Sequence, residues 1–172
     1  MSENNIDKHI LGQDSDIVHL DSMQDNRDIS LAMAQQARRS IYIFTQDLDP
    51  QIYDTPGFIE AIKDVAIHDS RSFVQIIIKD SSKAVLHGHR LVELARRLTS
   101  HIHIRKASIE YNEYNAAYLI ADETGYVRRT NAARYEGIAC FNDRNECRHL
   151  INFFETAWEK ATPDPELRRL HL

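Results

Sequence analysis

The chain of 172 residues has a mass of 19.9 kDa, the size of one ordinary domain with its own hydrophobic core. Hydrophobic residues make up 42% of it and charged residues 27%, so the composition predicts a soluble globular protein and excludes a fibrous, low-complexity or disordered one. The 21 Lys and Arg residues against 26 Asp and Glu residues give a formal charge of −5, which excludes a whole-molecule attraction to nucleic acid or anionic lipid.

The charge is distributed unevenly. Residues 1–80 carry 7 basic and 14 acidic side chains, whereas residues 81–172 carry 14 basic and 12 acidic ones. Any anion site must therefore be a local patch, and we expect it in the second half of the chain.

The two cysteines, Cys140 and Cys147, are too few for a disulfide framework and have no CxxC or paired His/Cys spacing. We expect a reducing compartment, no metal site and no cofactor. The apolar runs are far shorter than the roughly 20 residues that span a bilayer, and the first five residues lack the basic start of a secretion signal. The expected location is the cytoplasm, with no membrane span.

Residues 1–22 are polar and rich in aspartate, which predicts an N-terminal tail with at most a short edge strand near residues 17–20. Helical and strand patterns then alternate. The expected elements are a helix from Asp25 or Asp28 to about residue 39, a strand over 40–45, a loop over 46–55, a helix over 58–66, a strand over 73–78, a turn over 79–83, a helix over 86–98 and a strand over 102–105.

The second half predicts three more strands, over 114–121, 125–129 and 135–141, with a hairpin turn over 122–125. A closing helix runs from residue 142 or 143 to about 161, where Pro163 and Pro165 stop it. The predicted fold class is α/β (α+β), a mixed β-sheet flanked by helices in one domain over residues 23–162, followed by a C-terminal tail over 163–172.

Common catalytic motifs are absent, including a Gly-rich phosphate loop, GxSxG, HExxH and the dinucleotide fingerprint. Residues 39–43, 65–66, 74–78, 91–98 and 102–105 nevertheless form a pattern by which the chain resembles the phospholipase D-like superfamily, in particular its small single-domain bacterial nuclease type. The signature of that family is HxKxxxxD, followed after six residues by Gly-Ser, then by a glutamate and a closing helix that ends near a tryptophan.

Three signature positions keep a related residue: Asp122 stands at the signature Asp, Thr130 at the Ser and Glu136 at the glutamate. Trp158 lies near the end of the closing helix.

Three other signature positions differ. Asn115 replaces the histidine, Ala117 the lysine and Arg129 the glycine. In the family the histidine attacks phosphorus and the lysine stabilises the charge on the phosphate oxygens. An asparagine amide is no useful nucleophile at neutral pH, and alanine supplies no cation. The resemblance therefore implies the fold of the family with a degenerate HKD motif, a pseudoenzyme without its hydrolytic pair.

A remnant site could still bind phosphate, because guanidinium groups match phosphate geometry bidentately. The candidate ligand-binding residues are Asn115, Asp122, Arg128, Arg129, Thr130, Asn131, Arg134 and Glu136. Arg128 and Arg129 are neighbours on a strand and so point to opposite faces. At most one of them therefore faces the former site, and the alternative is that these charges form a solvated surface.

Other clusters have two interpretations each. The five tyrosines 111, 114, 118, 126 and 135 could stack nucleic-acid bases or pack across strands. His87 and His89, and likewise His101 and His103, could act as acid, base or metal ligands, or be ordinary surface and helix-start residues. Asp47, Asp49 and Asp54 could face a ligand crevice or serve as turn and capping residues.

The leading hypothesis is a non-catalytic phospholipase D-like domain that binds a phosphate-bearing ligand, with nucleic acid as one candidate. One alternative is a divergent phosphodiesterase or nuclease that uses His87, His89 or His103. The other alternative is a regulatory protein-interaction domain. Because family members often join two copies of the motif across a two-fold axis, the resemblance also implies a homodimer in which the former sites face each other.

Overall fold

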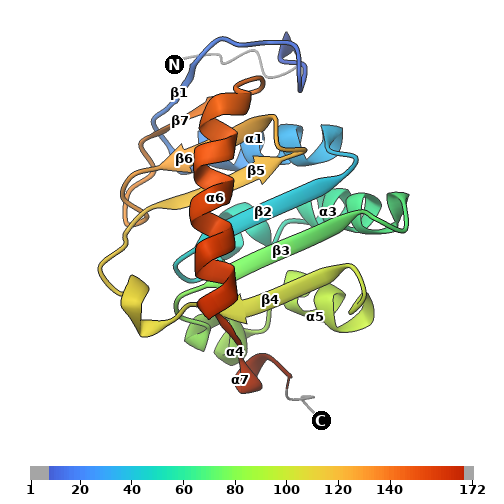
Figure 1. Cartoon of the computed structure of the whole chain (residues 1–172), viewed down its shortest axis with the longest axis vertical. Helices are drawn as coiled ribbons and strands as arrows, with labels where there is room; N and C mark the ends of the chain where they lie inside the picture. The colour runs from blue at the N-terminus through green and yellow to red at the C-terminus, as the bar shows by residue number, and fades with distance from the viewer. Residues whose placement is uncertain (1–7, 169–172) are drawn as a thin grey trace.

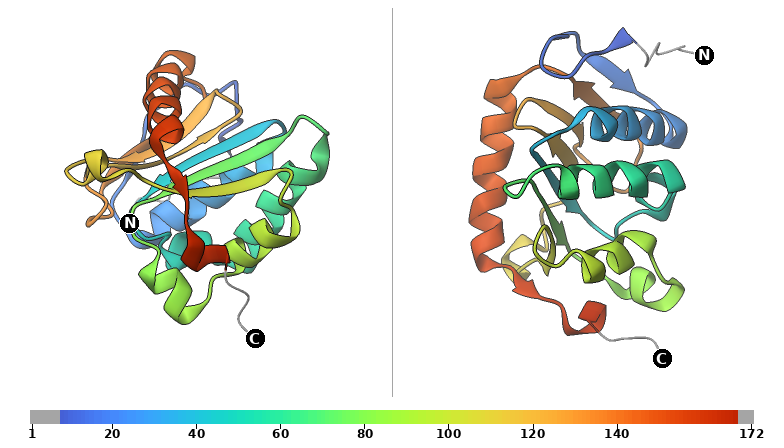
Figure 2. Two further views of the ribbon diagram at one scale, coloured as in Figure 1. Left: turned by 60° about the horizontal axis from the view of Figure 1, so that its bottom comes forward. Right: turned by 90° about the vertical axis from the view of Figure 1, so that its right-hand side faces the viewer.

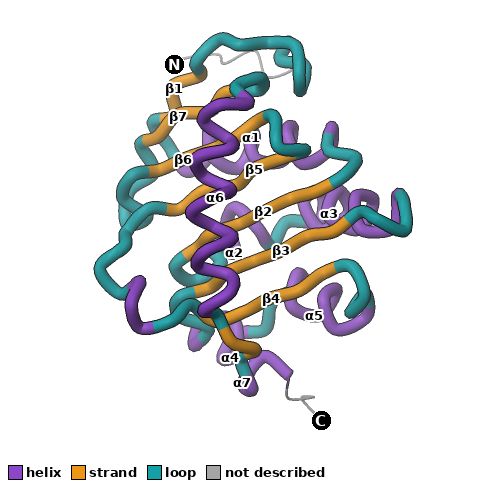
Figure 3. Tube along the Cα trace, viewed as in Figure 1, coloured by secondary structure: helices purple, strands orange, loops and turns teal. Residues whose placement is uncertain are grey.

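The protein is described by a computed structural model over residues 8–168. Residues 1–7 of the expected N-terminal tail and residues 169–172 of the expected C-terminal tail lie outside the described residues. The centre of the molecule is an eight-stranded mixed sheet in the order β1-β7-β6-β5-β2-β3-β4-β8 (Figure 1, Figure 3).

The strands are β1 (Val18–Leu20), β2 (Ser40–Thr45), β3 (Phe73–Ile78), β4 (Ile102–Lys106), β5 (Ala117–Ala121), β6 (Gly125–Arg129), β7 (Gly137–Cys140) and β8 (Thr162–Pro163). The helices are α1 (Met23–Gln36), α2 (Pro50–Tyr53), α3 (Pro56–His68), α4 (Ser82–His87), α5 (Arg90–Arg97), the 3₁₀ turn η2 (Ile109–Tyr111), α6 (Arg144–Lys160) and α7 (Pro165–Arg168). This mixed sheet with flanking helices confirms the predicted fold class.

The directions of the strands give the sheet two distinct ends. β2, β3 and β4 are parallel, and β5 runs antiparallel to β2. The loops that follow β2, β3 and β4 therefore lie beside the start of β5 and the end of β6, and we call this the carboxyl end of the sheet. At the other end, the amino end, the three parallel strands begin beside the β5–β6 hairpin.

Helices cover both faces of the sheet, but unequally (Figure 2). α1, α3 and α5 lie on one face over a large cluster of buried aliphatic side chains. On the other face α6 lies alone across the strands. Its Phe154 is fully buried and contacts Tyr42 edge-on at 5.1 Å between ring centroids. Apolar side chains are thus buried on both faces of the sheet, and this burial is the main favourable contribution to the free energy of folding.

Several elements differ locally from the prediction. Ser22, not Asp25 or Asp28, caps α1 by accepting a hydrogen bond from the N–H of Asp25, and the helix ends at Gln36 rather than near residue 39. The expected loop over 46–55 contains the short helix α2, which Asp49 caps by accepting a hydrogen bond from the backbone N–H of Gln51. The expected helix over 86–98 is two helices, because Gly88 has a φ of 74° between them, a conformation that only glycine adopts freely. β5 begins at Ala117 rather than at residue 114. Within the described residues no helix is both long and apolar enough to cross a membrane.

Candidate functional site

Six of the eight predicted site residues lie at the carboxyl end of the sheet. Arg129 is the last residue of β6 and pairs across the ladder with Ala117, the first residue of β5. Asn115 precedes that strand, and its carbonyl accepts a hydrogen bond of 2.8 Å from the N–H of Ala132 in the loop after β6. That loop, which leads to β7, carries the remaining four, which are all exposed: Thr130, Asn131, Arg134 and Glu136.

Arg129 is buried at this end, with only 5% of its surface exposed. Its Nη1 donates to the carbonyl oxygens of Ala132 and Arg134 at 3.1 and 3.2 Å. The guanidinium also lies 5.5 Å from the ring centroid of Tyr135. The buried guanidinium thus holds together the loop after β6, and its nearest partners are neutral.

The loop after β2 closes over the same spot. The hydroxyl of Tyr135 donates to Asp49 at 2.9 Å, so α2 is tied to the end of β6. Tyr53 of α2 is buried, which raises the pKa of its hydroxyl, whereas the hydrogen bond and positive charge of Arg129 act in the opposite direction. α2 therefore packs against Arg129 and Tyr135 at the carboxyl end of the sheet through polar side chains.

Arg128 points to the opposite face, as the strand alternation predicts. Its Nη1 pairs with Glu146 of α6 at 2.5 Å. The structure therefore does not bring Arg128 together with Arg129.

Asp122 lies apart from the other predicted residues, at the amino end, because β5 separates it from Asn115. Its carboxylate accepts hydrogen bonds from the backbone N–H groups of Arg38, Arg39 and Ser40 at 2.7 to 3.1 Å. The residue has a φ of 54° and begins the hairpin turn, a conformation that aspartate tolerates better than most residues. Its carboxylate joins the β5–β6 hairpin to the start of β2.

Lys79 was missed by the sequence reasoning. It follows β3, and its Nζ donates to the carbonyls of Tyr114 and Asn112 at 2.6 and 3.0 Å. Partial burial lowers the pKa of this lysine, and the charge of Glu113 opposes that shift. The only sequence signal was its place after a predicted parallel strand, where open sheets present ligand-facing groups.

The histidines do not form one cluster. His89 is buried, caps α5 by accepting from the N–H of Leu91 through Nδ1, and bonds the carbonyl of Leu48 through Nε2. Burial lowers the pKa of His89, so the neutral ring with a proton on Nε2 satisfies both contacts. His87 is exposed on α4, and His103 lies on β4 opposite Gln75. His101 bonds the carbonyl of Ser72 at 2.9 Å. The helix-start interpretation therefore holds for His89.

The three aspartates after β2 have local partners. Asp49 caps α2, Asp47 pairs with Lys83 at 3.2 Å, and Asp54 pairs with Arg90 at 2.9 Å. In residues 8–168 no group of three or more His, Cys, Asp or Glu side chains is arranged to hold a metal ion.

The tyrosines mostly pack against α6. Tyr118 is buried and stacks on Phe44 at 5.7 Å, and Tyr114 stacks on Phe153 of α6 at 4.3 Å. Tyr126 is buried on the same face, and Tyr111 meets Phe153 edge-on. Cross-strand and helix packing is therefore the role of these four rings, and Tyr135 alone belongs to the Arg129 cluster.

Solved structures share this architecture at low sequence identity. TrmBL2, described as an archaeal chromatin protein with a novel mode of DNA binding, aligns over 85% of this chain with a TM-score of 0.63 and 15% identity. The chain spans about half of TrmBL2, 52% of its length.

Two further solved structures are matched over nearly their whole length. Nuc from Salmonella typhimurium, a phospholipase D family member, aligns with a TM-score of 0.57 and 14% identity, over 85% of this chain and 95% of Nuc. NucT from Helicobacter pylori aligns with a TM-score of 0.56 and 14% identity, over 87% of this chain and 98% of NucT. At such identities the likeness shows the fold, which is phospholipase D-like.

A comparison with curated proteins finds no match. A family model described as a domain of unknown function, DUF7931, matches residues 22–170, most of the chain. The chain therefore belongs to this DUF7931 family, on a phospholipase D-like fold.

Proposed function

We propose that this domain binds a phosphate-bearing ligand, nucleic acid included, at the carboxyl end of its sheet and does not cleave it. The observation that carries the proposal is the pair of residues at the two signature positions. Asn115 is an exposed amide and Ala117 a buried methyl group. The amide is no useful nucleophile at neutral pH, and the methyl group supplies no cation to stabilise a developing negative charge.

Cations support the binding half of the proposal. Lys79 and Arg134 lie at this end, and neither forms an ion pair with a carboxylate in the described part of the chain. The buried Arg129 adds positive charge here, although its Nη1 is already bonded to two backbone carbonyls. Meanwhile Asp47 and Asp54 are neutralised by Lys83 and Arg90. Uncompensated cations beside exposed amide and hydroxyl groups favour an anion.

The structural relatives make nucleic acid the first ligand to test. TrmBL2 is described as a DNA-binding chromatin protein, and Nuc as a member of the phospholipase D family. These descriptions belong to proteins of 14 to 15% identity, so they guide the choice of probe and do not assign the activity.

The experiment combines binding and cleavage on the same preparation. Fluorescence anisotropy with a fluorescein-labelled single-stranded oligonucleotide measures affinity, and gel analysis of the same oligonucleotide, with and without divalent metal, measures cleavage. The expected result is binding that weakens with salt and an intact oligonucleotide. Cleavage that is lost in His87→Ala would establish the divergent phosphodiesterase instead.

Variants locate the binding. Arg134→Ala with Lys79→Gln removes two cations from the carboxyl end and is expected to weaken binding about tenfold, since each lost phosphate contact costs roughly 1 kcal/mol. Lys63→Ala, which removes an exposed cation from α3, is the matched control. Absence of any oligonucleotide binding by the wild-type chain would favour the protein-interaction alternative and overturn the proposal.

A homodimer with facing carboxyl ends is part of the proposal. Two strongly exposed apolar side chains, Leu86 at 77% and Ile109 at 79%, belong to α4 and η2, which follow β3 and β4 at this end. Light scattering during size exclusion at micromolar concentration is expected to give the mass of two chains, and Leu86→Glu with Ile109→Glu the mass of one. A clean wild-type monomer would overturn the dimer while leaving the binding proposal standing.

A further inference from the structure

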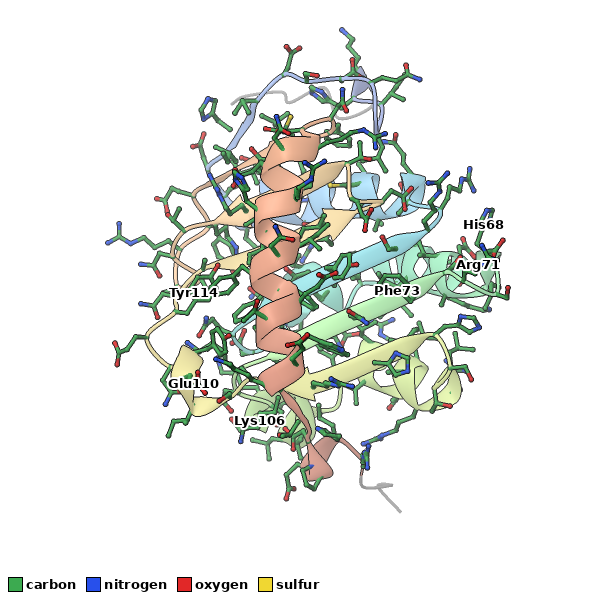
Figure 4. The ribbon with its side chains drawn as sticks, in the orientation of Figure 1. His68, Arg71, Phe73, Lys106, Glu110 and Tyr114 are labelled. Carbon is green, nitrogen blue, oxygen red and sulfur yellow. The ribbon has the colours of Figure 1, made fainter. Side chains whose placement is uncertain are left out.

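A polar cleft with a volume of about 900 Å³ lies at the amino end of the sheet, opposite the end that carries the proposed function. It is formed by the turns before β2 and β3, the β5–β6 hairpin and the first residue of α6. Figure 4 labels His68, Arg71 and Phe73 at this end, and Lys106, Glu110 and Tyr114 at the other. The cationic and aromatic side chains of the cleft are Arg38, Arg39, His68, Arg71, Phe73 and Arg144.

The four arginines of this cleft are available to a ligand. All four are exposed, and within residues 8–168 none of their guanidinium groups has an ion pair or a side-chain hydrogen bond. By contrast, Arg90 and Arg128 elsewhere in the molecule are each paired with a carboxylate. The cleft thus gathers free guanidinium groups in a chain whose formal charge is −5.

Three carboxylates also line the cleft, but two of them are turned toward the backbone. Asp122 accepts the backbone N–H groups of Arg38, Arg39 and Ser40. Asp69 accepts the N–H of Arg71 at 2.9 Å. Backbone amides therefore offset these two negative charges, and the exposed Glu123 is the third carboxylate. Unlike Asp69 and Asp122, the four guanidinium groups are exposed and have no hydrogen-bond or ion-pair partner within residues 8–168.

The volume of the cleft and its guanidinium groups indicate the kind of ligand that it can bind. Four guanidinium groups spread over about 900 Å³ exceed what one phosphate can engage, so the ligand carries several phosphates. Phe73 is only half-buried and meets Tyr42 edge-on. A partly exposed aromatic ring beside arginines is the kind of surface on which unpaired bases stack. We infer that this cleft binds a single strand of nucleic acid, its phosphates on the arginines and a base against Phe73.

This site goes beyond the proposed function, since it uses the opposite end of the sheet and none of the same residues. It also lies largely in the first half of the chain, where the charge count predicted no anion site. Three of its four arginines, Arg38, Arg39 and Arg71, precede residue 81, and the topology brings them next to Arg144.

The test uses the full chain and a fluorescein-labelled dT12 oligonucleotide in fluorescence anisotropy over a salt series. Arg38→Ala with Arg71→Ala keeps the backbone amides that hold Asp122 and Asp69, so the fold should persist, as unchanged circular dichroism would verify. We expect the dissociation constant to rise about tenfold, and the slope of log affinity against log salt to become less steep by about 1.4.

The control is Lys63→Ala with Arg97→Ala, two exposed cations outside the cleft, and it should change affinity by less than about twofold. Phe73→Leu keeps an apolar side chain and removes the ring, and we expect it to weaken binding severalfold at unchanged salt slope. The site would be overturned if Arg38→Ala with Arg71→Ala had the same affinity and the same salt slope as the control. If only Arg134→Ala with Lys79→Gln loses affinity for dT12, the cleft site is overturned and the proposed function stands. If only the cleft variants lose affinity, the cleft site is supported and binding at the carboxyl end is overturned.

Discussion

Arg129 at the carboxyl end of the sheet and the arginines at the amino end have opposite environments. At the carboxyl end Arg129 is 5% exposed and donates to two backbone carbonyls, with Tyr135 beside it. At the amino end Arg38 and Arg71 are exposed and have no side-chain partner in the described part of the chain.

The difference separates structural cations from cations that are free for a ligand. A buried guanidinium that has satisfied its donors internally stabilises the fold, and moving it to a ligand would leave carbonyl oxygens unpaired. An exposed guanidinium without internal partners can bind a ligand without breaking any hydrogen bond of the fold. Substitutions of buried, internally bonded side chains should therefore lower stability, whereas substitutions of exposed, unpaired arginines should lower affinity.

The largest effect is expected for Arg129→Ala. The substitution removes the donor from the partly buried carbonyls of Ala132 and Arg134 and from the buried hydroxyl of Tyr53, which should lower the free energy of unfolding by about 3 kcal/mol. Urea unfolding followed by circular dichroism measures the loss. A change below about 0.5 kcal/mol would break the comparison, because Arg129 would then be as dispensable as an exposed arginine.

Asp122→Ala should rank second, at about 2 kcal/mol. The substitution removes the acceptor for three backbone N–H groups and places alanine at a φ of 54°, which strains a residue with a Cβ. Asp122→Asn keeps one acceptor oxygen and tolerates this φ, so it should lose about half as much. Equal unfolding curves for both variants would contradict the amide-holding role.

His89 should make the stability of the folded protein sensitive to acid. Burial lowers the pKa of His89 below the ordinary value of 6.5, so below about pH 6.5 the unfolded chain binds a proton that the folded chain excludes. Stability contributed by the neutral ring is full above that pH and falls as the pH drops toward the folded pKa, by at most about 1.4 kcal/mol per pH unit. His89→Asn should lose this part of the pH dependence, measured as the wild-type minus variant difference in unfolding free energy between pH 7.5 and 5.5. Parallel pH profiles would contradict it.

The smallest stability effect should come from Arg71→Ala, within about 0.5 kcal/mol of the wild type. Among residues 8–168 its side chain has no hydrogen-bond or ion-pair partner whose loss could destabilise the fold. A larger destabilisation in thermal or urea unfolding would mean that the amino end uses its arginines structurally, as the carboxyl end does.

Much of the fold could be predicted from sequence because its signals are local. The strands over 40–45, 73–78 and 125–129 follow from β-branched and apolar runs, and the hairpin at Asp122 follows from its turn residues. The opposite orientation of Arg128 and Arg129 follows from the strand period alone.

The environment of each site residue could not be predicted, because it depends on contacts between distant parts of the chain. Arg129 is buried by α2 and the Tyr135–Asp49 hydrogen bond, 86 residues apart in sequence. Lys79 reaches the loop at Tyr114 only because β3 and β5 flank β2. The charge count over halves of the chain missed the arginines of the amino end, since the parallel strands bring together turns that composition treats as separate.

Because α6 alone among the described helices covers one face of the sheet, the position of α6 near the end of the chain determines when that face can be buried during folding. This helix is built from residues 144–160 but covers Tyr42 and Phe44 of β2, about a hundred positions earlier. During synthesis from the N-terminus these aromatic rings have no cover until the helix is complete. A nascent or truncated chain that ends before residue 144 would therefore expose an apolar face of the sheet. Such fragments are expected to bind chaperones or to aggregate.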